Sequence, residues 1–159
     1  RYLLLRHINP MEDSDVTWER LDEWYTANLT NGLGNLVARV MKLSEDHSES
    51  PAQLVDRDSY IRSANIHVET DIESFEFNRA LDEIWNRIKG LDEAITKREP
   101  FKLVKENPEE GKAMIFSMEA ELHGIGLVLE PFMPDTSKKI IDAIRANKKP
   151  ENLFPRLAK

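Results

Sequence analysis

Apolar residues recur every three or four positions along most of the chain, and this spacing constrains the fold more than any other feature. The clearest run is Leu29, Leu33, Leu36, Val40 and Leu43. A helix of 3.6 residues per turn gathers such residues on one side, where they can pack against a core. No segment shows the alternation of a half-buried strand. The periodicity therefore predicts an all-α fold, an antiparallel helix bundle with short connections.

Helix boundaries follow from capping residues and prolines. Long helices are predicted over 17–43, 72–97, 107–129 and 135–146, and a short one over 56–63. A short first segment covers 2–7, and 101–105 forms one helical turn or an ordered bend. Asp15 or Thr17, Asn107 and Asp135 are suited to N-caps. Pro100 ends the helix before it, because proline lacks the N–H that a helix interior needs.

The segments between these helices also have predicted roles. The stretches 9–15 and 44–53 are loops, and Pro131-Phe132-Met133-Pro134 is a stiff turn. Phe75 and Phe77 are the first apolar positions of the helix over 72–97. The irregular tail from Lys148 carries Leu153, Phe154 and Leu157, which we expect to dock on the bundle.

Length and charge place the chain among single soluble domains. It has 159 residues, no cysteine and no apolar run near the roughly 20 residues of a membrane span. With 29 acidic and 22 basic residues the net charge is −7, which argues against a general polyanion binder but allows a local basic site. It begins Arg1-Tyr2-Leu3 without an initiator methionine, so we expect one domain, 1–159, cut from a longer cytoplasmic chain.

Nothing in the sequence indicates catalysis or a metal site. His7, His47, His67 and His123 are scattered, and surface or helix-packing roles account for them. Glu119, Glu121 and His123 only approximate the Glu-x-x-His spacing of helical di-metal proteins. The G-x-G of Gly32–Gly34 has no strand before it, as a phosphate loop requires.

One helical stripe carries polar groups at an unfavourable place. At 100° per residue, Trp24, Asn28, Asn31, Asn35 and Arg39 fall within about 80° of arc, beside the apolar row. Asparagine prefers caps and turns, and Gly32 and Gly34 each cost about 1 kcal/mol in a helix interior. Such local conflict is expected at functional sites. Asn and Arg suit nucleobase edges, although a polar face at the bundle edge explains the stripe equally well.

A second stretch, Lys97 to Lys105, sets an aromatic among cations. Pro100 and Phe101 lie between Lys97, Arg98, Lys102 and Lys105. An exposed ring on a rigid bend with cations around it suits base stacking and phosphate neutralisation. The alternative is a phenylalanine that returns to the core, with solvated lysines beside it.

Together these stretches resemble the C-terminal anticodon-binding helical domain of methionyl-tRNA synthetase, a class I aminoacyl-tRNA synthetase. The matching segments are Asn31-Gly-Leu-Gly34-Asn35-Leu-Val-Ala-Arg39, Pro100-Phe101-Lys102-Leu103-Val104-Lys105, Pro131-Phe132-Met133-Pro134-Asp-Thr136 and Leu153–Arg156, in order along nearly the whole chain. The signatures "HIGH" and "KMSKS" of the catalytic Rossmann domain are missing. His123-Gly-Ile-Gly126 is similar to the first only in its letters and occupies expected core positions.

The resemblance implies functional residues. Asn35 and Arg39 contact anticodon bases, and Phe101 stacks on one, oriented by Pro100. Beyond what the resemblance implies, we expect supporting RNA contacts from the nearby cations Lys97, Arg98, Lys102 and Lys105. Asn31 and Asn28 either add such contacts or only support the helix and face water. Two positions depart from the family: Phe101 stands where tryptophan is usual, and Asp92 where asparagine is common.

The function implied is recognition of the CAU anticodon of methionine tRNA by a monomeric fragment without catalytic residues, metal or cofactor. The complete enzyme would use ATP and methionine in a catalytic domain of the same chain. Alternatives are the corresponding domain of a leucyl, valyl or cysteinyl enzyme, a helical protein-interaction module without RNA binding and, more remotely, a metal-dependent helical enzyme.

Overall fold

The fold is all-α, as the periodicity predicts. The computed structural model describes residues 1–8, 13–48, 55–64 and 67–157, and no strand occurs among them. Its helices are α1 (Tyr2–His7), α2 (Trp18–Trp24), the π-helix η1 (Tyr25–Gly34), α3 (Asn35–His47), α4 (Arg57–Ala64), α5 (Val68–Glu73), α6 (Phe77–Arg98), α7 (Pro100–Glu106), α8 (Pro108–Leu129) and α9 (Pro134–Arg145). No helix of these described segments is long and apolar enough to cross a membrane.

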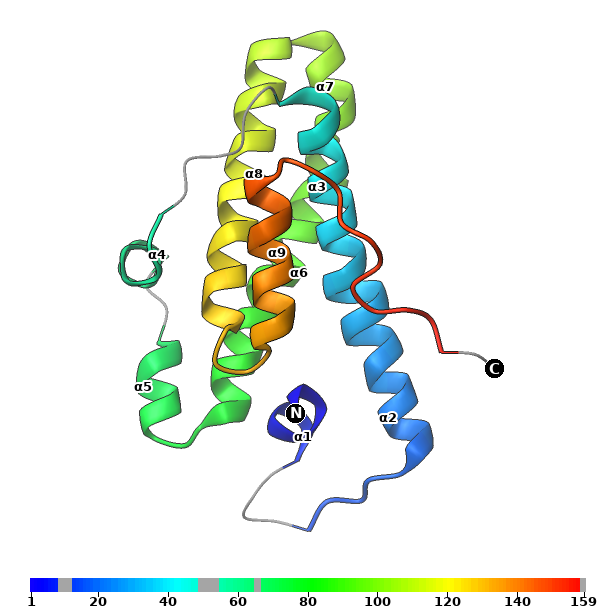
Figure 1. Cartoon of the computed structure of the whole chain (residues 1–159), viewed down its shortest axis with the longest axis vertical. Coiled ribbons are helices and arrows are strands. Elements are labelled where there is room, and N and C mark those ends of the chain that lie inside the picture. The colour runs from blue at the N-terminus through cyan, green and yellow to red at the C-terminus, as the bar shows by residue number, and fades with distance from the viewer. Residues whose placement is uncertain (9–12, 49–54, 65–66, 158–159) are drawn as a thin grey trace.

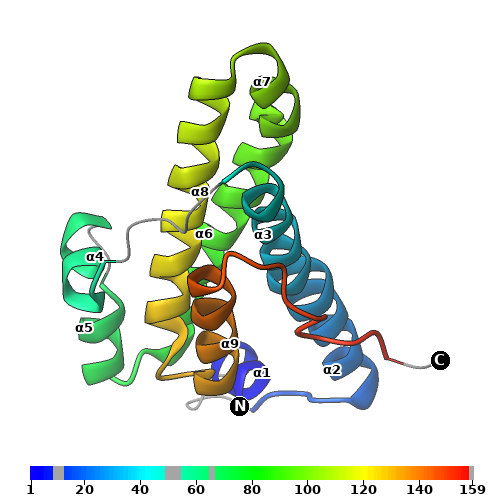
Figure 2. The ribbon, with the colours of Figure 1, turned by 45° about the horizontal axis from the view of Figure 1, so that its top comes forward.

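Helix α8 is the central element of the bundle. It packs against α3, α4, α6, α7 and α9 (Figure 1). The chain rises through α6, descends through α8 and rises again through α9, which is the predicted antiparallel order (Figure 2). Helices α3 and α6 run in the same direction, because α4 and α5 carry the chain back to the other end.

Glycines in α8 allow its neighbours to come close. A Cβ on Gly124 would lie 2.0 Å from Cε2 of Tyr60, and one on Gly126 would lie 3.2 Å from Cγ2 of Ile140. Both glycines and His123 are buried, so the segment His123–Gly126 is helical core as expected. Glu119, one turn earlier, accepts a hydrogen bond from Ser44 Oγ at 2.9 Å. No group of three candidate metal ligands occurs in the part of the chain described.

Two of the predicted helix starts are confirmed and one is wrong. Thr17 Oγ1 accepts from the N–H of Arg20, and Asn107 Oδ1 accepts from the N–H of Glu110. The helix predicted to start at Asp135 instead has Met133 at its N-cap and Pro134 at its first position. Proline suits that position because its missing N–H has no partner there.

The helix predicted over 72–97 is two helices. Helix α5 ends in a Schellman motif: the N–H of Glu76 donates to the C=O of Asp71 at 2.7 Å, and that of Phe75 to Ile72 at 3.0 Å. Phe75 takes the left-handed position, with φ 60°, that usually belongs to glycine. Its side chain is 75% exposed instead of packing inside a helix. The prediction of one continuous helix was wrong because phenylalanine is not a residue that usually indicates a left-handed turn.

The helix predicted over 17–43 is continuous but not uniform. It extends to His47, into the predicted loop at 44–53, and its middle, η1, is a π-helix. The rest of that loop and residues 9–12 of the first loop lie outside the described residues, apart from Ser48. In a π-helix the hydrogen bonds run to the fifth residue, so the turn is wider and 100° per residue no longer holds. The predicted polar stripe crosses this segment and is therefore divided.

Two of the three apolar tail residues that we expect to dock on the bundle are packed against it. Leu153 and Phe154 are half-buried against the core, whereas Leu157 is 44% exposed and does not dock. Figure 1 shows the tail crossing over the helical segment formed by η1 and α3.

Candidate functional site

Three of the predicted site residues meet in one hollow of about 380 Å³. Asn35 and Arg39 come from α3, and Phe101 comes from the first turn of α7. The remaining lining residues are Ala38, Lys42, Leu43, Ile95 and Lys149. We call this space the Phe101 hollow. It joins an amide, a guanidinium and an aromatic ring from parts of the chain more than sixty residues apart in sequence.

The position of Phe101 depends on the junction between α6 and α7. Glu99 adopts a left-handed conformation with φ 45°, which ends α6 and turns the chain. Pro100 follows as the buried first residue of α7. A Cβ on Gly111 would lie 2.5 Å from Cα of Val104, so only glycine lets α7 sit this close to α8. Phe101 remains 45% exposed, so a flat partner can reach it.

Arg39 is held by two side chains of α6. Its Nη1 donates to Asp92 Oδ1, and its Nη2 donates to Thr96 Oγ1 at 3.4 Å. The guanidinium has five N–H donors, so this pairing fixes its plane while other donors remain. Asp92, the departure from the family pattern, is therefore the ion-pair partner of Arg39.

The asparagines of the divided stripe lie beside different parts of the fold. Asn28 faces α1, where its Oδ1 accepts from Arg6 Nη1 at 3.4 Å and its Nδ2 lies 3.4 Å from His7 Nε2. Trp24 also faces α1, stacking on His7 with ring centroids 4.3 Å apart. Asn31 and Asn35 are exposed and face the tail. Only Asn35 and Arg39 of the stripe line the Phe101 hollow.

The predicted cations lie around Phe101 but outside the hollow. Lys97, Arg98, Lys102 and Lys105 are exposed on α6 and α7. Lys102 Nζ pairs with Glu99 Oε1 at 2.7 Å and lies 5.9 Å from the Phe101 ring centroid.

Two further lysines line the hollow and were not predicted. Lys42 lies three residues after Arg39 on α3, so helical spacing could have identified it. Its hydrogen bond to Asp46, at 2.6 Å, raises the pKa of Lys42 and keeps it charged. Lys149 comes from the tail, and no sequence signal places it beside α3.

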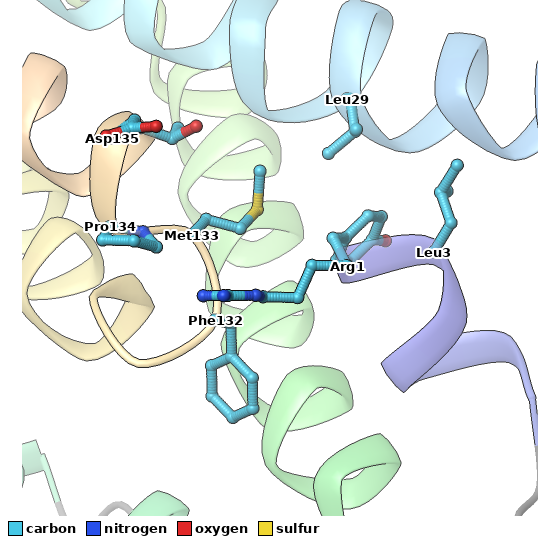
Figure 3. A pocket seen from close by; sticks show the side chains of 9 residues that line it. Arg1, Leu3, Leu29, Phe132, Met133, Pro134 and Asp135 are labelled. Carbon is cyan, nitrogen blue, oxygen red and sulfur yellow. The ribbon is translucent and has the colours of Figure 1, made fainter.

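Another depression of about 380 Å³ lies beside the middle of η1 (Figure 3). Leu29, Met133 and Phe132 line it together with the start of α1. It contains none of the predicted site residues. Phe132 is buried. The chain turns there, as predicted, with the Phe132 N–H donating to the C=O of Leu129 at 3.0 Å.

Known proteins show similarity over nearly the whole chain. The methionine–tRNA ligase of Streptomyces coelicolor is 30% identical over 159 residues, covering 92% of this chain and 30% of that protein. That of Caldanaerobacter subterraneus is 28% identical over 154 residues, covering 91% of this chain and 24% of that protein. The chain thus spans less than a third of the length of these relatives. No protein-family profile matches it.

The fold has a solved counterpart. A crystal structure of apo Mycobacterium tuberculosis methionyl-tRNA synthetase superposes with a TM-score of 0.76 at 20% identity, covering 99% of this chain and 38% of that one. The fold is that of a helical part of this solved structure. The sequence similarity relates the chain to the aminoacyl-tRNA synthetase class. Within that class, the chain is related to part of the methionine–tRNA ligases.

Proposed function

We propose that this domain recognises the CAU anticodon of methionine tRNA. The observation that carries the proposal is the meeting of Asn35, Arg39 and Phe101 in one hollow. Amide and guanidinium groups form paired hydrogen bonds with base edges, and an exposed ring stacks on a base face. Because the chain is related to methionine–tRNA ligases, we infer that the bound tRNA is a methionine tRNA.

Each residue has a role in the proposed complex. Phe101 stacks on one unpaired base, positioned by Pro100. Asn35 and Arg39 hydrogen-bond base edges, with Arg39 oriented by Asp92. Backbone phosphates are attracted by the surrounding cations, which are Lys42, Lys97, Arg98, Lys102, Lys105 and Lys149.

The same proposal extends to the longer protein. In it the domain adds binding free energy for the correct tRNA, while a catalytic domain in the same chain uses ATP and methionine in the cytoplasm. Nothing in the hollow requires a metal or cofactor for this role, because stacking and hydrogen bonding suffice.

Stem-loop titration tests the proposal directly. The 159-residue chain is titrated at fixed salt with RNA stem-loops carrying CAU or the anticodons of leucine, valine and cysteine tRNAs. One stacked base contributes about 1–3 kcal/mol, so Phe101→Ala should weaken CAU binding about 5- to 150-fold. Phe116→Ala is the matched control, since Phe116 is 43% exposed on α8, away from the hollow.

Arg39 provides the test of specificity. Arg39→Ala should reduce the preference for CAU, whereas Arg62→Ala, the same charge change on α4, should not. Equal weakening for every anticodon would reduce Arg39 to a phosphate contact. Equal affinity of the unmodified chain for all stem-loops would refute anticodon recognition. Absence of binding to every stem-loop, together with co-purification of a protein partner, would favour a protein-interaction module without RNA binding.

A further inference from the structure

The depression in Figure 3 has a methionine side chain as part of its wall. Met133 and Leu29 both line this space of about 380 Å³. In the figure, the sulfur and the terminal methyl group of Met133 point towards Leu29. The thioether of Met133 therefore borders a space far larger than one small solute requires.

The four methionines of the described residues differ in their access to solvent. Met41 lies in α3 and Met118 in α8, and they are 0% and 4% exposed. Met114 is half-buried on α8 and packs against the core. Met133 is also half-buried, but the depression leads to its side chain. Because an oxidant must reach the sulfur, Met133 should react before the other three.

A hydroperoxide converts methionine to its sulfoxide by transferring one oxygen atom. With hydrogen peroxide, a lone pair of Sδ attacks one peroxide oxygen, the O–O bond breaks, and the other oxygen leaves as water after proton transfer. The sulfur loses two electrons and the peroxide gains them. The product carries a polar S=O group in place of an apolar thioether, and methionine sulfoxide reductases reverse the change.

The backbone of Met133 is held in place, so oxidation must be accommodated by the side chain. Its N–H donates to the C=O of Leu129 at 2.8 Å, and its C=O accepts from the N–H of Ser137 at 2.9 Å. The side chain packs against the core and shares the depression with Leu29 and Phe132, which are 5% and 3% exposed. A sulfoxide oxygen against this apolar wall is poorly hydrated, so the oxidised side chain should turn outward and give up its apolar contacts.

We propose that Met133 is a site of reversible oxidation by small hydroperoxides, and that its sulfoxide weakens the packing of the turn between α8 and α9. These two helices pack against each other in the bundle. Loss of the Met133 contacts therefore lowers the stability of the fold. The inference does not depend on RNA binding, because no residue lines both this depression and the Phe101 hollow.

Timed oxidation with hydrogen peroxide tests the assignment. The 159-residue chain carries Met11→Leu throughout, because Met11 lies outside the described residues. Peptide mass spectrometry follows the addition of oxygen at Met41, Met114, Met118 and Met133, and thermal unfolding is measured at each time. Met133 should be oxidised first, and its oxidation should lower the Tm by about 2 °C or more. Treatment with methionine sulfoxide reductases should restore the Tm.

Two variants of this chain separate Met133 from the remaining methionines. Met133→Leu keeps an apolar side chain of similar volume, so its Tm before treatment should be nearly that of the parent chain. Its Tm should then stay constant over the peroxide exposure that oxidises Met133 in the parent. Met114→Leu, the matched change on α8, should respond to peroxide as the parent does.

Three results would overturn the proposal. Oxidation of Met133 no faster than that of the buried Met41 and Met118 would show that the depression does not expose its sulfur. Earlier oxidation of Met114 would show that the depression does not select the site. Full conversion of Met133 with an unchanged Tm would show that the sulfoxide is accommodated without loss of packing.

Discussion

Replacing Gly34 by alanine tests whether close packing of the tail explains this glycine. Alanine is favoured over glycine by about 1 kcal/mol in a helix interior, so propensity alone predicts stabilisation. In the structure, however, the added Cβ would lie 3.0 Å from the carbonyl oxygen of Leu29 and 3.2 Å from Cδ2 of Phe154. Crowding of a packed contact costs about 1–3 kcal/mol. The net change in the free energy of unfolding should therefore lie between about zero and a loss of 2 kcal/mol.

Gly90 provides the matched control on α6. It is exposed, and a Cβ there would meet nothing within 4 Å. Gly90→Ala should raise the free energy of unfolding by about 1 kcal/mol, the full difference in helix propensity between glycine and alanine. For a chain of this size, that corresponds to a rise in Tm of about 2–4 °C. Urea and thermal unfolding of the two variants give the comparison. Equal stabilisation of Gly34→Ala and Gly90→Ala would show that packing of Phe154 does not require a glycine at position 34.

Three further changes follow from the packing and charges. Gly124→Ala should destabilise the fold by about 1–3 kcal/mol in urea unfolding, because its Cβ would overlap the buried Tyr60 ring; an unchanged midpoint would mean that the ring moves freely. Burial lowers the pKa of His123, so the unfolded state binds more protons below about pH 6.5. Stability should therefore fall from pH 7 to 5, less steeply in His123→Gln, and equal slopes would contradict this. A double-mutant cycle of Arg39 and Asp92 should give a coupling of about 0.2–1 kcal/mol that shrinks with salt, as for a partly exposed pair; a larger, salt-insensitive value would contradict it.

Periodicity and caps were sufficient for the fold because most helices here bury one apolar side. The boundaries at Thr17, Asn107 and Pro100 follow from local hydrogen-bonding rules that act within one turn. The break at Phe75 could not be predicted in this way. Phe75 can stay in the left-handed conformation because the turn provides hydrogen bonds to the last carbonyl groups of α5. No residue in this stretch, such as a glycine, indicates the turn in the sequence.

The candidate site was predictable only in part. Asn35 and Arg39 are one helical turn apart, so their proximity follows from spacing within α3. Their nearness to Phe101 depends on how α7 sits beside α3, and it was expected from the family resemblance. Tertiary packing determines three further features: the π-helix, the docking of Phe154 and the position of Lys149. The spacing of residue types along the sequence does not predict such contacts.

Charge pairing explains how an acidic chain with a net charge of −7 can carry the RNA site that we propose. Arg39 and Lys42 pair with Asp92 and Asp46 at the protein surface, so part of their charge is balanced before any ligand arrives. Balanced cations attract distant phosphates weakly, yet their N–H groups remain oriented donors. In the proposed complex, discrimination between bases thus comes from fixed geometry at the Phe101 hollow, while general attraction to RNA stays low. Asp92 fits the proposed site for that reason, because its ion pair with Arg39 orients the guanidinium as a directed hydrogen-bond donor.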